Sequence, residues 1–259
     1  MTPYVFFLDI DDTIAIHSEP TPHLIQTLHK AQAMGHKIII DTGRAPSYLP
    51  EWVRQVPFDG YVCGCGAYVE LGGKILERYA LPTEDCIWLC RLFSFPDAPG
   101  LIFEGEQQIV RYRTSRWEPQ PTWITVQTPE EADAVLRRQT VTKVNINHDI
   151  SPEIIPVLEE RFSVIWHPTE FYTECCYPGR SKATGIETVM KAYGLPHSRS
   201  VAIGDSENDL DMIRYAAVGI AMGQSKEEIK AQADRVTGTI EEEGAVTAIE
   251  QLIAEAEKQ

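Results

Sequence analysis

The run Phe6-Phe7-Leu8-Asp9-Ile10-Asp11-Asp12-Thr13 joins an apolar stretch to a group of acidic residues. The apolar residues that end at Leu8 predict a short buried strand. If the backbone stays extended, Asp9 and Asp11 point to the same side, because side chains two residues apart share a face. Ligands of open α/β sheets bind at the carboxyl ends of strands. Two carboxylates there favour a bound cation, and ligands that are all oxygen favour Mg²⁺. The alternative is a strand end with solvated acids before a turn.

Strands and helices alternate through the first 80 residues. A helix is predicted over residues 21–35 because apolar side chains recur at helical spacing and Gly35 follows. A strand over residues 36–40 comes next, then a helix over 45–56 that Pro46 and Pro50 shorten or distort. A third strand follows at residues 61–63, and Gly72-Gly73 predicts a hairpin.

The pattern changes near residue 81 and returns near residue 182. Between them the sequence predicts helices over residues 83–93, 129–139 and 151–161, and strands over 101–104, 108–112, 141–147, 163–167 and 171–176. The fold class expected is α/β, with a doubly wound, mostly parallel Rossmann-like sheet as the core. The core would consist of residues 1–81 and 179–259. Residues 82–178 would form an inserted α/β cap domain, with hinges near 80–83 and 177–180.

Four separated signals follow predicted strand ends or open a helix. They are Asp9-x-Asp11-x-Thr13, Thr42-Gly43-Arg44, Lys182 and Gly204-Asp205-x-x-Asn208-Asp209. Each is a weak motif alone, since Thr42, Asp205 and Asp209 could be helix caps and Lys182 a solvated helix residue. Their order along the whole chain resembles the four motifs of the haloacid dehalogenase superfamily phosphatases. The insertion between the second and third motifs resembles the Cof-like subfamily, which carries a class IIB cap.

The resemblance implies catalytic residues and a metal site. Asp9 would be the nucleophile that forms an aspartyl-phosphate, and Asp11 the general acid and base. Mg²⁺ would be held by the Asp9 carboxylate, the Asp11 carbonyl and the Asp205 carboxylate. Asp209 would bind a metal-coordinated water or orient its neighbours.

The resemblance also implies a phosphate-binding set. It comprises Thr42, Gly43, Arg44, Lys182 and Asn208. The Thr42 hydroxyl and nearby backbone N–H groups would bind the phosphate oxygens, and Lys182 would pair with the phosphate as a point charge.

Two features of the sequence bear on the substrate. Cys65-Gly66-Ala67 stands where relatives usually carry Asn-Gly-Ala, so a thiol replaces a stronger hydrogen-bonding side chain. Cations and aromatic side chains gather in the predicted cap, where they would contact a substrate or simply pack with one another. These residues are Arg111, Arg113, Arg116, Trp117 and Trp123.

Composition limits the partners. The chain has 259 residues and a net charge of −15, which disfavours nucleic acid because a phosphate backbone needs a positive surface. There is no apolar run long enough for a membrane span and no N-terminal targeting segment, and the six cysteines lack zinc or redox spacing. We therefore expect a cytoplasmic monomer or homodimer with reduced thiols.

The expected function is Mg²⁺-dependent hydrolysis of a small phosphorylated metabolite, such as a sugar phosphate. Two alternatives stay open. A phosphosugar mutase would use the same aspartyl-phosphate, and a non-catalytic regulatory protein would only bind phosphate or metal. Retention of both Asp9 and Asp11 favours an enzyme.

Overall fold

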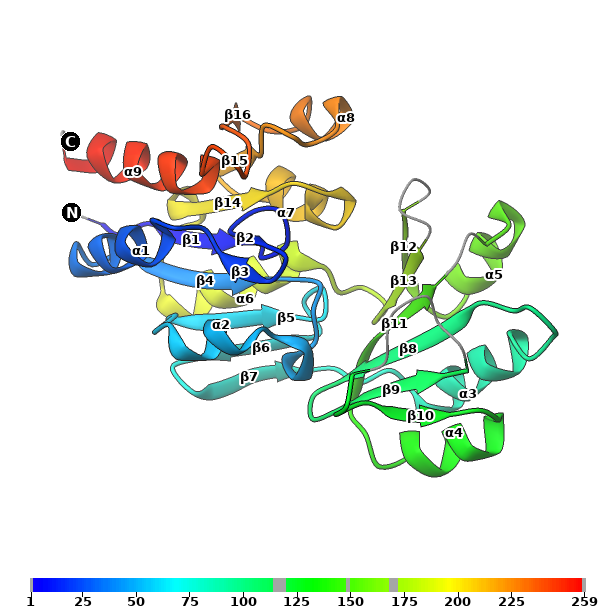
Figure 1. Ribbon diagram of the computed structural model, residues 1–259. Helices are drawn as coiled ribbons and strands as arrows, with labels where there is room; N and C mark the ends of the chain where they lie inside the picture. Colours follow the sequence, from blue (N-terminus) through cyan, green and yellow to red (C-terminus); the bar gives the residue numbers. More distant parts are fainter. Residues whose placement is uncertain (1, 114–119, 148–149, 168–171, 258–259) are drawn as a thin grey trace. The chain divides into compact units, whose positions relative to one another are not determined.

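The computed structural model describes residues 2–113, 120–147, 150–167 and 172–257 (Figure 1). Their contacts divide the chain into two units. The first contains residues 1–43, 50–76 and 181–259, and the second contains residues 44–49 and 77–180. Arg116 and Trp117, which the sequence placed in a cap cluster, lie outside the described residues.

The first unit is built on a sheet in the order β16-β15-β14-β1-β4-β5-β6-β7. Its strands are β1 (Val5–Leu8), β4 (Lys37–Asp41), β5 (Gly60–Cys63), β6 (Tyr68–Leu71), β7 (Lys74–Arg78), β14 (Ser200–Gly204), β15 (Val218–Ala221) and β16 (Arg235–Val236). The strands from β16 to β5 pair in parallel, and β6 pairs with β5 antiparallel. A short hairpin of β2 (Ala15–Ile16) and β3 (Glu19–Pro20) follows β1.

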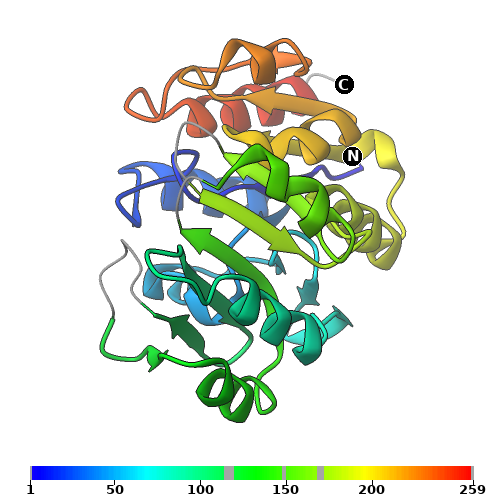
Figure 2. The ribbon, with the colours of Figure 1, turned by 90° about the vertical axis from the view of Figure 1, so that its right-hand side faces the viewer.

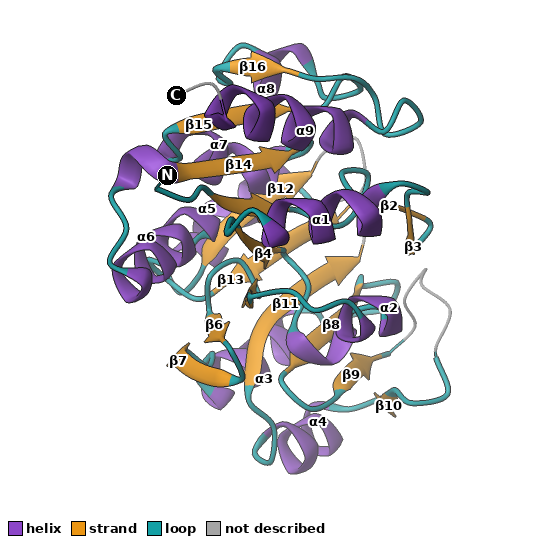
Figure 3. Cartoon of the chain, turned by 90° about the vertical axis from the view of Figure 1, so that its left-hand side faces the viewer, coloured by secondary structure: helices purple, strands orange, loops and turns teal. Residues whose placement is uncertain are grey.

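Helices cover both faces of this sheet. On one face lie α1 (Leu24–Ala33) and α9 (Gly244–Glu257), and on the other lie α6 (Lys182–Tyr193) and α7 (Leu210–Tyr215) (Figures 1 and 3). The shorter helices of the unit are α2 (Glu51–Gln55) and α8 (Glu227–Lys230), with 3₁₀ turns η3 (His197–Arg199) and η4 (Glu207–Asp209). The face under α6 buries a continuous apolar cluster. These features confirm the doubly wound α/β fold that the sequence predicted.

The second unit is a six-stranded sheet with helices on one face (Figure 2). The sheet order is β10-β9-β8-β11-β13-β12. The strands are β8 (Gly100–Gly105), β9 (Ile109–Tyr112), β10 (Ile124–Val126), β11 (Val141–Asn147), β12 (Ser163–His167) and β13 (Tyr172–Cys176). The helical segments are α3 (Thr83–Leu92), α4 (Pro129–Leu136), η2 (Pro152–Ile154) and α5 (Ile155–Glu159).

The predicted helix over residues 45–56 is wrong as a single element. The chain forms a 3₁₀ turn, η1 (Pro46–Tyr48), and then the five-residue helix α2. Pro46 and Pro50 explain the break, because the residue before a proline avoids the helical region and a proline lacks the donor that a helix interior needs. Ala45 and Leu49, each directly before a proline, both have extended backbone angles.

The structure shows two smaller features. Thr128 caps α4, because its hydroxyl accepts a hydrogen bond from the Glu131 amide at 3.2 Å. The six cysteines are buried free thiols. Among the described residues, no helix is both long enough and apolar enough to cross a membrane.

Candidate active site

Asp9 follows the last residue of β1, between two parallel neighbours. Its amide still donates to the Ile203 carbonyl of β14 at 3.1 Å, so the strand geometry continues through this residue. The side chain is buried although it carries a carboxylate. The sequence therefore placed Asp9 correctly at the carboxyl end of a central strand, where α/β sheets bind ligands.

Lys182, the first residue of α6, is the basic residue at the centre of this site. Its side chain is fully buried, and Nζ donates to Asp9 Oδ1 at 2.6 Å and also to Asp209 Oδ1. The helix begins there because Ser181 and Thr184 form a capping box around the first turn. The buried ion pairs rule out the alternative in which Lys182 is a solvated helix residue.

The loop after β14 brings two further carboxylates to the site. Asp205, Asp209 and Asp9 each offer a carboxylate oxygen, and these three atoms lie within 4.8 Å of one another. Asp209 Oδ2 accepts from the Asp205 and Ser206 amides at 2.8 and 3.0 Å. Asp209 thus caps η4 and pairs with Lys182 at the same time, and its role at a metal site stays a prediction.

Gly204 makes room for this arrangement. A Cβ atom at that position would lie 2.4 Å from Asp209 Cγ, which is far inside van der Waals contact. The first position of the fourth motif therefore requires glycine for a steric reason, since only glycine lets the Asp209 carboxylate pack against the end of β14.

The remaining predicted residues differ in how they relate to this cluster. Thr42 is buried at the end of β4, where its amide donates to the Val62 carbonyl at 2.9 Å, and Gly43 follows it. The Asn208 side chain accepts from the Ser206 hydroxyl at 3.0 Å, inside the loop after β14. Arg44 belongs to the second unit and donates to the Tyr48 carbonyl at 3.1 Å. A phosphate-binding role for these residues stays a prediction.

Asp11 is exposed, unlike Asp9. The backbone turns after Ile10, whose carbonyl accepts from the amides of Ile14 and Ala15, both at 3.0 Å. Asp11 nevertheless lies close enough for its charge to raise the pKa of Asp9. An exposed carboxyl next to a buried one is suited to exchange protons with water.

Asp41 is a buried carboxylate that the sequence analysis missed. It is the last residue of β4, has an exposed fraction of 0% and feels the charges of Lys182, Asp209 and Asp9. The signal was present in the sequence, because residues 36–40 predict a strand and Asp41 continues it with a charge.

The buried carboxylates have perturbed protonation. Burial, opposed by the Lys182 charge and reinforced by Asp209 and Asp11, raises the pKa of Asp9 to about 7. Burial and the charges of Asp209 and Asp9 raise the pKa of Asp205 to about 9. Burial also works against the Lys182 ammonium, but the neighbouring carboxylates outweigh it and raise its pKa well above the usual value. Several carboxylates therefore compete for one ammonium group.

This charge imbalance fits a divalent metal ion. Asp9, Asp205 and Asp209 present only carboxylate oxygens, the donor type that Mg²⁺ prefers. The raised pKa values of Asp9 and Asp205 mean that these carboxyls bind protons in the absence of a cation that would offset their negative charge. A divalent cation would supply that charge and release the protons.

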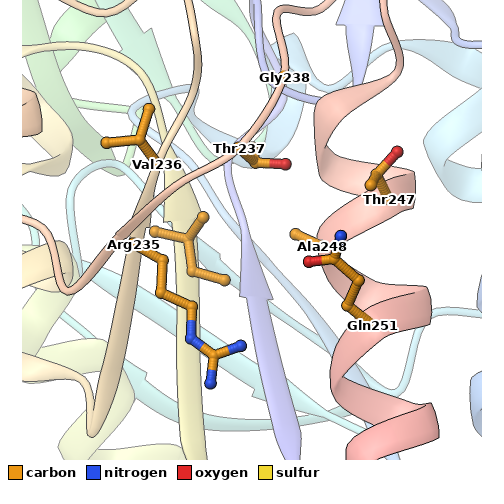
Figure 4. A pocket seen from close by; sticks show the side chains of 8 residues that line it. Arg235, Val236, Thr237, Gly238, Thr247, Ala248 and Gln251 are labelled. Atoms are coloured by element: carbon orange, nitrogen blue, oxygen red, sulfur yellow. The ribbon is translucent and has the colours of Figure 1, made fainter.

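A separate cavity of about 200 Å³ lies between β16 and α9 (Figure 4). Arg235, Thr237 and Gln251 are among the residues that line it, and none of them is a predicted site residue. The Arg235 guanidinium forms a bidentate pair with Glu255, both contacts at 3.1 Å. This cavity is not part of the acidic site.

A family model of haloacid dehalogenase-like hydrolases matches residues 6–249, so the chain belongs to this family. This confirms the resemblance and the expectation of an enzyme. The chain is a hydrolase of the phosphatase class.

Several named phosphatases are similar to this chain over almost its whole length. The chain is 34% identical over 264 residues to YitU of Bacillus subtilis (strain 168), a 5-amino-6-(5-phospho-D-ribitylamino)uracil phosphatase, covering 93% of this chain and 94% of the relative. It is 26% identical over 263 residues to the pyridoxal phosphate phosphatase YbhA of Escherichia coli (strain K12), covering 92% and 94%. The solved structure of the subclass IIB sugar phosphatase BT4131 matches with a TM-score of 0.80 and 28% identity, covering 96% of this chain and 98% of that one.

Proposed function

We propose that the chain is a Mg²⁺-dependent phosphatase that hydrolyses a small phosphorylated metabolite through an aspartyl-phosphate on Asp9. The observation that carries the proposal is the cluster of Asp9, Asp205 and Asp209 beside the buried Lys182. Asp9 follows a central strand, and its carboxylate accepts a hydrogen bond from Lys182, whereas the Asp209 carboxylate also accepts from two backbone amides.

Each residue has a chemical task in this proposal. The Asp9 carboxylate attacks phosphorus, so the P–O bond to the leaving group breaks and an acyl phosphate forms. Asp11 gives its proton to the leaving alkoxide and then takes a proton from the water that hydrolyses the acyl phosphate. Lys182 and the Thr42 hydroxyl bind the phosphate oxygens.

Asp9 and Asp205 would hold Mg²⁺, with Asp209 orienting the site through its contacts with Lys182 and the Asp205 amide. When bound, the ion lowers the charge repulsion between the carboxylate nucleophile and the phosphate group. Nucleophilic attack also needs Asp9 deprotonated, and Lys182 favours that form by its hydrogen bond.

The substrate would be chosen by the second unit, which we propose to be the cap domain. One face of its sheet packs against the helices and is apolar, whereas the strand positions on the other face carry charged groups. Lys143 Nζ lies 3.8 Å from Glu104 Oε1 and 3.5 Å from Glu174 Oε1. A buried polar face of this kind suits a hydroxyl- or amine-bearing substrate such as the metabolites named for the relatives. The six buried thiols support a reducing compartment, which we propose to be the cytoplasm.

A trapping experiment tests the chemistry. The protein, Asp9→Asn and Asp11→Asn would be assayed for phosphate release from a panel of phosphorylated metabolites, with Mg²⁺ or with EDTA. We expect metal-dependent release that Asp9→Asn abolishes. With an aryl phosphate, whose leaving group needs no proton, Asp11→Asn should accumulate a phosphoryl group on the peptide that contains Asp9, detectable by mass spectrometry after acid quench.

The same experiment separates the alternatives. Transfer of the phosphoryl group to a second hydroxyl of the substrate, without release of phosphate, would support the mutase. A folded, Mg²⁺-binding protein that neither releases nor transfers phosphate would contradict the proposal.

A further inference from the structure

Asp11, the proposed general acid and base, lies in a tight turn after β1. The Ile10 carbonyl accepts from the amides of Ile14 and Ala15, both at 3.0 Å, so the chain folds back at once. Asp12 has a positive φ of 54°, a left-handed conformation that glycine adopts at the least cost. The direction of the Asp11 side chain therefore depends on how firmly the backbone of this turn is held.

Gln224 holds the backbone of this turn from the loop after β15. Its Nε2 atom donates to the Asp12 carbonyl at 2.5 Å, although the two residues are 212 positions apart in the chain. Its Oε1 atom accepts from the Ile240 amide at 3.0 Å. One side chain therefore ties the turn that carries Asp11 to the segment that leads into α9.

The two partners of Gln224 define the kind of side chain that this position needs. A backbone carbonyl only accepts and a backbone amide only donates, so Asp12 requires a donor and Ile240 requires an acceptor. Glutamine offers both on one terminal amide group. Glutamate would keep the acceptor for Ile240 and lose the donor for Asp12, so the two bonds can be separated by substitution.

The backbone on which Gln224 stands is itself fixed. The amide of the preceding Gly223 donates to the Gly238 carbonyl at 2.9 Å, and a Cβ atom on Gly223 would lie 2.8 Å from the Gly238 carbonyl carbon. Ile240 is buried. The Gln224 side chain is exposed, so its replacement would not leave a cavity in the core.

We propose that Gln224, which belongs to none of the four motifs, is a positioning residue that acts through Asp11. Its bond to the Asp12 carbonyl holds the turn so that Asp11 faces the oxygen of the leaving group. The inference rests on the proposed function, because it assumes that Asp11 gives a proton to that oxygen as the P–O bond breaks. Proton transfer needs hydrogen-bonding distance, so a small shift of the turn would slow it.

The test compares Gln224→Met and Gln224→Glu with Gln32→Met. Methionine removes both hydrogen bonds of Gln224 at similar length, whereas glutamate removes only the donor to Asp12. Gln32 is the matched control, because its Nε2 atom donates to the Pro57 carbonyl at 2.7 Å within the same unit and outside the acidic site.

Two readouts report on the turn and on proton transfer. Amide hydrogen exchange of the peptide that contains residues 10–15 reports how firmly the turn is held. The value of kcat/KM is measured with the fastest alkyl phosphate of the metabolite panel and with 4-nitrophenyl phosphate. The alkoxide leaving group needs a proton, and the nitrophenolate does not.

We expect faster exchange of residues 10–15 in both Gln224 variants and unchanged exchange there in Gln32→Met. For the alkyl phosphate, kcat/KM should fall about fivefold in both Gln224 variants, as the loss of one hydrogen bond allows. For 4-nitrophenyl phosphate it should fall by at most about twofold. In an Asp11→Asn background, Gln224→Met should cause no further loss with the alkyl phosphate, since the two residues act as one unit.

The possible failures can be told apart. Unchanged exchange of residues 10–15 in the Gln224 variants would mean that Gln224 does not hold the turn, and the inference is overturned. An equal loss of kcat/KM with both compounds would overturn it too, because Gln224 would then support the site as a whole and not Asp11. If the unsubstituted protein releases phosphate from neither compound, the proposed function itself fails, while hydrogen exchange still shows whether Gln224 holds the turn.

Discussion

Replacement of Lys182 by methionine should make the stability of the protein depend on pH in a defined way. Methionine fills a similar volume, so the main change is the loss of the ammonium group between Asp9 and Asp209. Removing one partner of a buried ion pair costs about 3–5 kcal/mol because the other charge stays buried. Here the carboxylates have another option, which is to take up protons.

The number of protons that each state binds sets the sign and the slope of the pH dependence of stability. With the cation gone, the pKa of the buried carboxyls rises further in the folded state, whereas in the unfolded state it stays near its ordinary value of about 4. We expect the folded variant to hold about one more proton than the folded unsubstituted protein, whereas the carboxyls of the two unfolded chains bind protons equally, so the stability of the variant falls more steeply as pH rises. Each extra proton makes the difference between the two proteins grow by about 1.4 kcal/mol per pH unit.

Urea unfolding in EDTA at pH 6, 7 and 8 would measure this difference. Lys37→Met is the control, because the Lys37–Asp59 pair is partly exposed and such pairs contribute about 0–1 kcal/mol. We expect the loss from Lys182→Met to grow by about 3 kcal/mol over these two pH units. A loss that is the same at every pH, or no larger than that of Lys37→Met, would refute the charge balance described for this site.

Three further predictions concern the metal, the glycine and the second unit. The raised pKa values of Asp9 and Asp205 are about 7 and 9, so the metal-free protein should lose stability as pH rises from about 4 through those values. Mg²⁺ should therefore raise the unfolding temperature more at pH 9 than at pH 6, which differential scanning fluorimetry would detect. Gly204→Ala should displace the Asp209 carboxylate, reduce stability by about 1–3 kcal/mol and weaken Mg²⁺ binding measured by calorimetry. Lys143→Met should leave two buried glutamates facing each other. Urea unfolding should show a loss of stability of about 3–5 kcal/mol at pH 8 and a smaller loss at pH 5. The variant should also prefer different substrates within the panel.

Three outcomes would contradict these predictions. A Mg²⁺-induced shift that does not change with pH would mean that metal binding displaces no protons. Normal metal affinity in Gly204→Ala would mean that Asp209 does not need its contact with that backbone. A Lys143→Met variant that is unstable but keeps its substrate preference would limit the polar sheet face to a structural role.

The sequence predicted the acidic strand ends because their signals are local. Asp9 and Asp205 each follow a short apolar run directly, and the parallel sheet then brings them to one edge. Lys182 was harder to place, because a lysine in the first turn of a helix is usually solvated. Its burial results from the packing of α6 against the sheet. In the sequence, only the order of the four motifs indicated that this lysine lies in the site.

Asp41 escaped prediction for the opposite reason. It lies between the predicted strand over residues 36–40 and the conspicuous Thr42-Gly43-Arg44 motif, and the sequence alone assigns it no chemistry. Only the register between β1 and β4 reveals that it neighbours Asp9. Register depends on long-range pairing. A single sequence therefore shows which side chains of a strand share a face, but not which residue of the neighbouring strand each one pairs with.

The same reasoning applies to the failed helix over residues 45–56. The prediction allowed Pro46 and Pro50 to shorten or distort one helix, but the two prolines imposed extended backbone at Ala45 and Leu49 and divided the segment. The consequence is not only local, because the segment 44–49 leaves the first unit and packs with the second. The Ala45 amide donates to Glu104 Oε2 at 3.0 Å, and the Ser47 hydroxyl donates to the Gly105 carbonyl at 2.7 Å.

The segment 44–49 joins the second unit directly to Gly43 of the first. Thr42-Gly43 ends in the first unit, and Arg44 begins a stretch that is held by hydrogen bonds to β8 of the second. Hydrogen bonds to β8 therefore anchor the segment that directly follows Gly43 to the second unit.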